Sequence, residues 1–203
     1  PEIVAVAREH DIPTLVDAAA ERPDVPNRYL ADGVDVVGYS GGKCLRGPQA
    51  SGLVMGKKEI LQAAFANGAP HHSLGRPMKA GKEEIMGLLA AVGKWAERDH
   101  DAEWKRWEHR LQVITDAVSD IDSVKTEVRQ PGRSNVAPVL WISWDTDAVG
   151  PSYEDVTKQL SEGDPRIEMF AHKEAVSVMP YMMEGEEEVV VAKRLREVLA
   201  GSR

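Results

Sequence analysis

The stretch Ser40-Gly41-Gly42-Lys43 constrains this chain more than any other, because it puts a lysine on a glycine-rich turn between two apolar segments. Residues 33–39 before it and residues 52–56 after it each predict a buried strand. A lysine held among buried strands loses hydration, and this disfavours its charged form. A neutral amine is what Schiff-base chemistry requires, so Lys43 is a candidate catalytic residue. The alternative is a solvated lysine on an ordinary turn.

A second constraint lies upstream, where Thr14 to Val16 form a short β-branched, apolar run that ends at Asp17. This run predicts a strand of a parallel sheet, and open α/β sheets bind ligands outside the carboxyl ends of their strands. Three alanines follow the aspartate, so a carboxylate would lie beside a wall of methyl groups, which suits a planar ring with a protonated nitrogen. The alternative is that Asp17 caps a helix beginning at Ala18.

Together the two features resemble the pyridoxal-phosphate enzymes of the aminotransferase-like fold, fold type I. In that family an Asp-x-Ala element holds the pyridinium nitrogen and packs on the ring. A Ser-x-x-Lys element one strand later supplies a phosphate ligand and the Schiff-base lysine. The resemblance therefore implies pyridoxal 5'-phosphate as the cofactor. It also implies that Asp17, Ala19, Ser40 and Lys43 bind the cofactor and that Lys43 is catalytic.

Residues 40–49 and 74–84 look more closely like the selenocysteine synthase-like branch of these enzymes. That branch includes L-seryl-tRNA selenium transferase and ammonia-lyases that act on phosphorylated amino-sugar acids. Arg76 matches a basic residue that holds anionic groups, so it is a candidate for substrate binding together with Lys79. Lys79 lies where selenocysteine synthases tend to have a second arginine, and this favours the lyases. The alternative for Arg76 is a surface salt bridge.

The pattern of elements predicts an α/β fold. Residues 1–81 alternate strand and helix, as expected for part of an aminotransferase-like large domain with a parallel sheet. Residues 82–121 predict a long connecting helical region, with an irregularity near Asp99 to Asp101. Residues 122–203 predict a small α+β C-terminal domain. The expected helices include 2–10, 57–67, 152–162 and 186–199, and the expected strands of the small domain are 124–128, 138–144, 167–171 and 175–178.

Enzymes of this branch are about twice as long as these 203 residues. Their first half carries the turn that cups the cofactor phosphate and the side chain that stacks on the ring. The resemblance therefore implies that this chain forms the C-terminal part of such an enzyme. Fold type I enzymes build their active sites at subunit interfaces, so a homodimer or a higher homo-oligomer is expected.

Composition narrows the setting and the partners. No apolar stretch approaches the roughly 20 residues that span a membrane, and a single cysteine, Cys44, favours the reducing cytoplasm. The histidines, including the adjacent His71 and His72, have no metal-ligand spacing, so no metal site is expected. The formal net charge of −8 and the acidic run 184–188 argue against nucleic-acid binding.

The sequence thus predicts a lyase of the ammonia-lyase type that uses pyridoxal phosphate and acts on a small anionic amino acid or amino-sugar acid. By resemblance, Lys43 would act as the general base at the α-carbon, while Asp17 keeps the ring nitrogen protonated and Ser40 binds the phosphate. Two alternatives stay open. The first is selenium transfer on seryl-tRNA, and the second is a non-catalytic fragment that keeps the fold.

Overall fold

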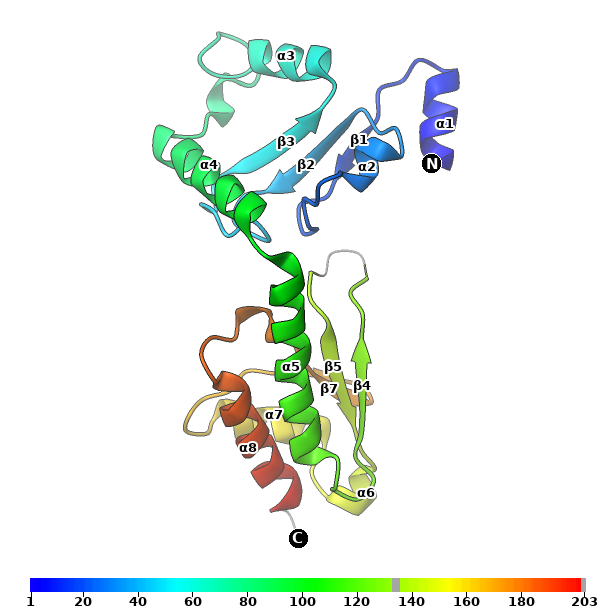
Figure 1. Ribbon diagram of the computed structural model, residues 1–203, viewed down its shortest axis with the longest axis vertical. Coiled ribbons are helices and arrows are strands. Elements are labelled where there is room, and N and C mark those ends of the chain that lie inside the picture. Colours follow the sequence, from blue (N-terminus) through cyan, green and yellow to red (C-terminus); the bar gives the residue numbers. More distant parts are fainter. Residues whose placement is uncertain (133–135, 202–203) are drawn as a thin grey trace. The chain divides into compact units, whose positions relative to one another are not determined.

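The computed structural model describes residues 1–132 and 136–201 (Figure 1). The chain divides into two compact units, Pro1–Arg98 and Asp99–Arg203. The first unit contains α1 (Glu2–Glu9), β1 (Leu15–Asp17), α2 (Arg28–Ala31), β2 (Val36–Ser40), β3 (Gly52–Gly56), α3 (Lys58–Asn67), the 3₁₀ turn η1 (Arg76–Met78) and α4 (Lys82–Glu97). The second contains α5 (His100–Val118), β4 (Lys125–Arg129), β5 (Val139–Ser143), α6 (Thr146–Val149), α7 (Tyr153–Ser161), β6 (Phe170–His172), β7 (Ala175–Val178), η2 (Pro180–Met182) and α8 (Glu187–Ala200). The predicted division into a large-domain part (1–81), a connecting helical region (82–121) and a small C-terminal domain (122–203) stays a prediction.

The sheet of the first unit has the strand order β1-β2-β3 among the described residues. β1 runs parallel to β2 as predicted, with Asp17 opposite Gly38. The prediction of a parallel sheet is wrong for β3, which pairs antiparallel to β2 with Gly52 opposite Ser40. The reason is the connection over residues 41–51, which contains no helix. A parallel return needs a crossover, usually a helical one, whereas a folded loop brings the chain back antiparallel.

β2 forms the apolar centre of this sheet. Val37 is fully buried, and Tyr39 is 4% exposed. Both pack with the side chain of Ala18, which follows β1. The Tyr39 hydroxyl accepts a 2.7 Å hydrogen bond from Asn27 Nδ2, so the buried ring keeps a polar partner. The buried middle strand therefore packs against the residue that follows β1, so the ends of β1 and β2 lie side by side.

Asp35, just before β2, sets the register between β1 and β2. Its carboxylate accepts hydrogen bonds from the amide nitrogen of Thr14 at 2.7 Å and from the Thr14 hydroxyl at 2.8 Å. The ammonium group of Lys57 lies 2.6 Å from the other carboxylate oxygen. The bond from Lys57, followed by the two from Thr14, holds the pKa of Asp35 well below its usual range. A charged carboxylate thus ties the start of β1 to β2.

Asp35→Asn is expected to lower the urea midpoint of unfolding at pH 7. Asparagine keeps an acceptor for Thr14 but loses the charge that attracts Lys57. A carboxyl group whose pKa is depressed by folding contributes stability above its unfolded pKa of about 4, and this contribution is lost as the pH falls further. The difference in urea midpoint between the variant and the wild type should therefore narrow below about pH 4. Circular dichroism during urea titration at pH 7 and pH 3 measures it, and a constant gap would contradict the assignment.

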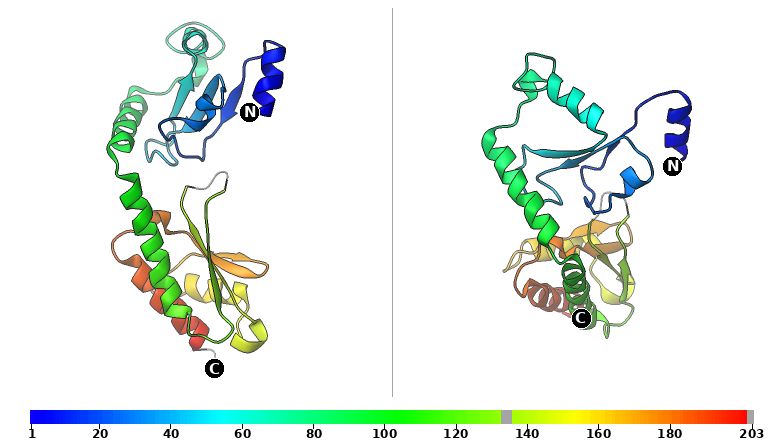
Figure 2. Two further views of the ribbon diagram at one scale, coloured as in Figure 1. Left: turned by 45° about the vertical axis from the view of Figure 1, so that its right-hand side comes forward. Right: turned by 45° about the horizontal axis from the view of Figure 1, so that its top comes forward.

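The sheet of the second unit has the order β4-β5-β7-β6, and each neighbouring pair is antiparallel. Helices α5, α7 and α8 pack together over one face of it (Figure 2). β5 shows why, because Leu140 and Ile142 are fully buried under the helices while Trp141 points to the opposite face. The small α+β architecture predicted for this region is what the structure shows.

Short sequence patterns, such as capping residues, predicted most of the helix boundaries. The predicted irregularity is confirmed, since α4 ends at Glu97 and the side chain of Asp99 caps α5 by accepting from the amide of Ala102. Ser152 caps α7 as predicted, in a reciprocal capping box with Asp155. The strand predicted at 167–171 is wrong in its first half, since β6 begins only at Phe170. The amide of Ile167 donates instead to the carbonyl of Leu160 at the end of α7.

Candidate functional site

The candidate site is built where the parallel strands β1 and β2 end together. The amide of Ala18 donates to the carbonyl of Gly38 at 2.9 Å, which extends the ladder one step beyond β1. The amide of Ser40 then donates to the carbonyl of Ala19 at 3.4 Å. Three of the predicted cofactor-binding residues, Asp17, Ala19 and Ser40, are therefore brought together at the carboxyl edge of the sheet.

The alternative role of Asp17 as a helix cap is wrong, because the residues directly after it form a turn and the next helix begins only at Arg28. Oδ1 of Asp17 accepts a 3.0 Å hydrogen bond from the amide of Ala19, which makes a tight turn instead. The carboxylate itself is exposed at the strand end. Of the three alanines, Ala18 is only 1% exposed and belongs to the core, while Ala19 and Ala20 are partly exposed. Ala19 can thus present its methyl group beside the carboxylate.

Lys43 lies on a loop that is closed by its own hydrogen bonds. Gly41 donates to the carbonyl of Ser51 at 2.9 Å, and Gly47 donates to the carbonyl of Gly41 at 2.7 Å. The amide of Arg46, which has a positive φ of 57°, donates to the carbonyl of Lys43 at 2.9 Å. Lys43 therefore sits on a turn of defined shape that begins three residues after Ser40.

Gln49 is a residue of this loop whose role was not predicted. Its side-chain amide donates to the carbonyl of Gly42 at 3.1 Å, directly beside Lys43. Its backbone also fills the space next to Gly42, so a Cβ at Gly42 would lie 2.7 Å from the Cα of Gln49. The Gly-Pro-Gln stretch was part of the family resemblance, but its position against Gly42 depends on the folded loop.

The side chain of Lys43 is exposed in this chain, which corrects the expectation of a lysine desolvated between buried strands. The flanking strands are in place, but the loop carries the lysine beyond their ends. Its ammonium group makes no hydrogen bond or ion pair with any described residue. Lys43 is a candidate catalytic residue because of its position on the loop after Ser40, and not because it is buried within this chain.

Gly42→Ala is expected to destabilise the first unit by about 1–3 kcal/mol and to slow the reaction of Lys43 with an aldehyde, because the loop must move away from Gln49. Gly93→Ala on α4 is the matched control, since nothing lies within 4 Å of a Cβ there. That control should be neutral or stabilising by up to about 1 kcal/mol. Thermal melts and mass spectrometry of a borohydride-trapped adduct measure both effects. Equal results for the two variants would contradict the packing argument.

Cys44 follows the lysine but is 5% exposed. Burial raises the pKa of its thiol to about 11, so the thiol stays protonated near neutral pH. A thiol, and not a thiolate, is a poor nucleophile. Cys44 is therefore better described as a filler of the core than as a reactive group.

Arg76 and Lys79 lie on a different segment, on and after the turn η1 that follows α3. The guanidinium of Arg76 donates to the carbonyl of Pro70 in its own loop, and Lys79 is exposed. His71 is exposed, with its Nδ1 3.1 Å from the carbonyl of Phe65. Within the described residues, no hydrogen bond or ion pair joins Arg76 or Lys79 to the site around Lys43.

Residues 1–132 and 136–201 contain neither a metal-binding cluster nor a membrane-spanning helix. No group of three or more histidine, cysteine, aspartate or glutamate side chains there could hold a metal ion. None of the helices in that part of the chain has the length and apolar character to cross a membrane.

Comparison with known proteins identifies the fold. The solved structure of D-glucosaminate-6-phosphate ammonia-lyase superposes with a TM-score of 0.72 at 28% identity, over 98% of this chain and 52% of that one. A ureidoglycine-glyoxylate aminotransferase from Bacillus subtilis has the same fold, with a TM-score of 0.60 at 16% identity over 99% of this chain and 56% of that one. The chain therefore has the aminotransferase-like fold of the fold type I pyridoxal-phosphate enzymes.

Sequence comparison gives the family. A profile of L-seryl-tRNA selenium transferases matches residues 1–131. The 5'-C-glycyluridine monooxygenase-decarboxylase of Streptomyces sp is 33% identical over 98% of this chain and 49% of that protein. The D-glucosaminate-6-phosphate ammonia lyase of Salmonella typhimurium is 32% identical over 97% of this chain and 52% of that protein. The chain belongs to the L-seryl-tRNA selenium transferase family, and it spans about half the length of the curated relatives it matches.

Proposed function

We propose that this chain is part of a lyase that uses pyridoxal phosphate and removes ammonia from a small anionic amino acid or amino-sugar acid. The observation that carries the proposal is the meeting of Asp17, Ala19 and Ser40 at the end of two parallel strands, with Lys43 on the loop that follows. Relatives in the family include an ammonia lyase, and this supports the reaction class.

The side chains present fit the cofactor chemically. A carboxylate suits a protonated ring nitrogen, a hydroxyl suits a phosphate oxygen and a primary amine suits an aldehyde. The carboxylate of Asp17 and the ammonium group of Lys43 are exposed, and the hydroxyl of Ser40 makes no hydrogen bond with any described residue. All three groups are therefore available to a ligand at this edge.

When bound, pyridoxal phosphate supplies an electron sink for a carbanion at the substrate α-carbon. In our proposal the Lys43 amine would hold the cofactor covalently, and it would also act as the general base that takes the proton from the substrate α-carbon. Asp17 holds a proton at the ring nitrogen by charge, and Ser40 positions the phosphate by a hydrogen bond. The methyl group of Ala19 packs on the ring face.

Arg76 and Lys79 are proposed to bind the anionic group of the substrate. A guanidinium fork suits a carboxylate or phosphate, and an ammonium adds a second positive charge. In this chain the Arg76 guanidinium is held by Pro70, so substrate binding requires that it release this carbonyl or share it. Arg76 is partly exposed and Lys79 is exposed, so both can be reached by a ligand or by another part of the protein.

Borohydride reduction of the whole protein with pyridoxal phosphate tests the proposal. We expect a single reduced adduct, and peptide mass spectrometry should locate it at Lys43. An adduct at another lysine, or none, would overturn the assignment. If the whole protein forms the adduct and this chain alone does not, the rest of the protein is needed to complete the site. If neither forms it, a fold that lacks catalysis is favoured.

Selenium transfer on seryl-tRNA is the second candidate, because the matching profile is that of the selenium transferases. Filter binding of the whole protein to tRNA separates the candidates, since the lyase requires no tRNA. The net charge of −8 and the lysine at position 79 favour the lyase. A homo-oligomer and a cytoplasmic location, both expected from the sequence, are part of the same proposal.

A further inference from the structure

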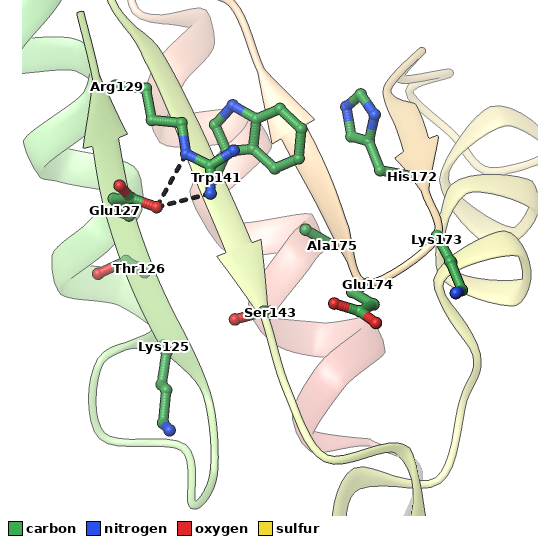
Figure 3. A pocket seen from close by; sticks show the side chains of 10 residues that line it. All are labelled: Lys125, Thr126, Glu127, Arg129, Trp141, Ser143, His172, Lys173, Glu174 and Ala175. Carbon is green, nitrogen blue, oxygen red and sulfur yellow. Dashed lines mark hydrogen bonds and ion pairs between the residues drawn. The ribbon is translucent and has the colours of Figure 1, made fainter.

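Among residues 99–132 and 136–201, no helix packs on one face of the sheet of the second unit. α5, α7 and α8 pack on the other face. The open face carries polar and aromatic side chains from three strands (Figure 3). They surround a hollow of about 640 Å³, which lies in the range of small-molecule sites. The residues that line it are Lys125, Thr126, Glu127, Arg129, Trp141, Ser143, His172, Lys173, Glu174 and Ala175.

One wall of the hollow is a row of three stacked planar groups. The guanidinium of Arg129 lies 4.0 Å from the centre of the Trp141 ring, and the His172 ring stacks on the indole at 4.1 Å with an angle of 23°. Glu127 holds Arg129 at 2.8 Å, and the Ser177 hydroxyl lies 2.9 Å from Nε2 of His172. Each plane has a second partner, so the wall is fixed before any ligand arrives.

The charges around the hollow favour an anion. Lys125 and Lys173 lie on opposite sides of it, with Ser143, Ala175 and the carboxylate of Glu174 between them (Figure 3). Neither ammonium group has a hydrogen bond or ion pair to any residue that the structure describes. Three cations, Lys125, Arg129 and Lys173, line the hollow with two carboxylates, Glu127 and Glu174, which leaves one net positive charge. Glu127 is engaged by Arg129, whereas Glu174 stays as a negative charge that a bound anion must avoid. A positive hollow is notable on a chain whose formal net charge is −8.

We propose that this hollow binds a small organic anion, a carboxylate or a phosphate monoester with a short apolar part. The anionic group lies between Lys125 and Lys173 and accepts a hydrogen bond from the Ser143 hydroxyl. The apolar part lies against the wall of Trp141 and His172. All the residues of this site belong to the second unit, and the site does not depend on the function proposed for the first.

Phenyl phosphate is a suitable probe because it combines a phosphate with a ring, and inorganic phosphate is its comparison. We expect saturable shifts of the amide resonances of β4, β5 and β6 in ¹H–¹⁵N spectra of the chain. Shifts caused by phosphate binding near Ser40 would appear in the first unit and are thereby distinguished. Phenyl phosphate should bind at least about threefold more tightly than inorganic phosphate, because its ring buries apolar surface against the wall.

The double variant Lys125→Ala/Lys173→Ala should weaken this binding about fivefold, since it removes two ionic contacts at a partly exposed site. Lys158→Ala is the matched control, because Lys158 is an exposed lysine on α7. No saturable shift on these strands, or equal binding by the double variant, would overturn the site. Equal binding of the two probes would overturn the role of the wall. Shifts that depend on protein concentration without a probe would show that a second copy covers the face, and this also overturns the proposal.

Discussion

Replacing Lys43 with alanine is expected to abolish the visible absorbance that pyridoxal phosphate would give the whole protein under our proposal, and to lower the rate of the proposed lyase reaction by about 10³-fold or more. The variant removes the amine proposed both to hold the cofactor and to act as the general base, and a positioned base alone contributes about 10²–10⁴-fold. The loop should keep its shape, because its hydrogen bonds come from backbone groups and from Gln49. Absorption spectra and steady-state rates measure the two losses.

Lys58→Ala is the matched control for this experiment. Lys58 is also an exposed lysine close to a strand of the same sheet, at the start of α3, and it has no ion pair within the described residues. The control should keep the spectrum and the rate. If Lys43→Ala kept the absorbance, another lysine would hold the cofactor, and the proposed role of the Ser-x-x-Lys element would be rejected.

The central strand of the first unit was predictable because its pattern is local in sequence. The run of valines before Ser40 predicts a buried strand, and Val37 is indeed fully buried. The position of Asp17 at the end of a strand followed from the β-branched run before it. That Ser40 belongs to the same site as Asp17 was implied by the resemblance to fold type I enzymes. The strand pairing confirms that β1 and β2 are parallel.

The properties that were not predicted depend on how the chain folds back on itself in space. The antiparallel direction of β3 follows from how the loop over residues 41–51 folds on itself. The exposure of Lys43 depends on what surrounds the loop in space, and no local pattern contains this information. The same holds for Gln49, whose contact with Gly42 spans seven residues.

The open face of the second unit shows the same limit. The alternation in β5 predicts that the side chain of Trp141 points to the other face of the sheet from those of Leu140 and Ile142. That pattern would have marked Trp141 as unusual, since a large aromatic residue then faces away from the core. Its stacking with Arg129 and His172 requires the strand order β4-β5-β7-β6, which brings three separate segments together.

A nearly buried ion pair joins two helices of the second unit. Nε of Arg110 on α5 lies 3.4 Å from Oε2 of Glu188 on α8, and the two side chains are 15% and 10% exposed. Arg110 also donates to the carbonyl groups of Met183 and Gly185, which lie just before α8. Oε2 of Glu188 makes an ion pair at this distance but no hydrogen bond. The attraction between the two charges therefore offsets little more than the free-energy cost of removing them from water.

Glu188→Ala is expected to destabilise the second unit by about 3–5 kcal/mol, because it leaves the Arg110 charge buried without its partner. Val189→Ala, at a neighbouring residue that is 52% exposed, is the control and should change stability by less than about 0.5 kcal/mol. Tryptophan fluorescence during urea unfolding is a suitable measurement, since Trp95 alone of the five tryptophans lies in the first unit.

The double variant Arg110→Leu/Glu188→Leu separates the energy of the pair from the penalty of breaking it. If the unpaired charge causes the loss, the double variant should recover most of the stability that Glu188→Ala loses, because apolar side chains of similar volume replace buried ion pairs at little cost. If the double variant is as unstable as Glu188→Ala, the anchoring of Met183 and Gly185 by Arg110 carries the stability instead. The attraction between the two charges would then be the smaller contribution to the contact between α5 and α8.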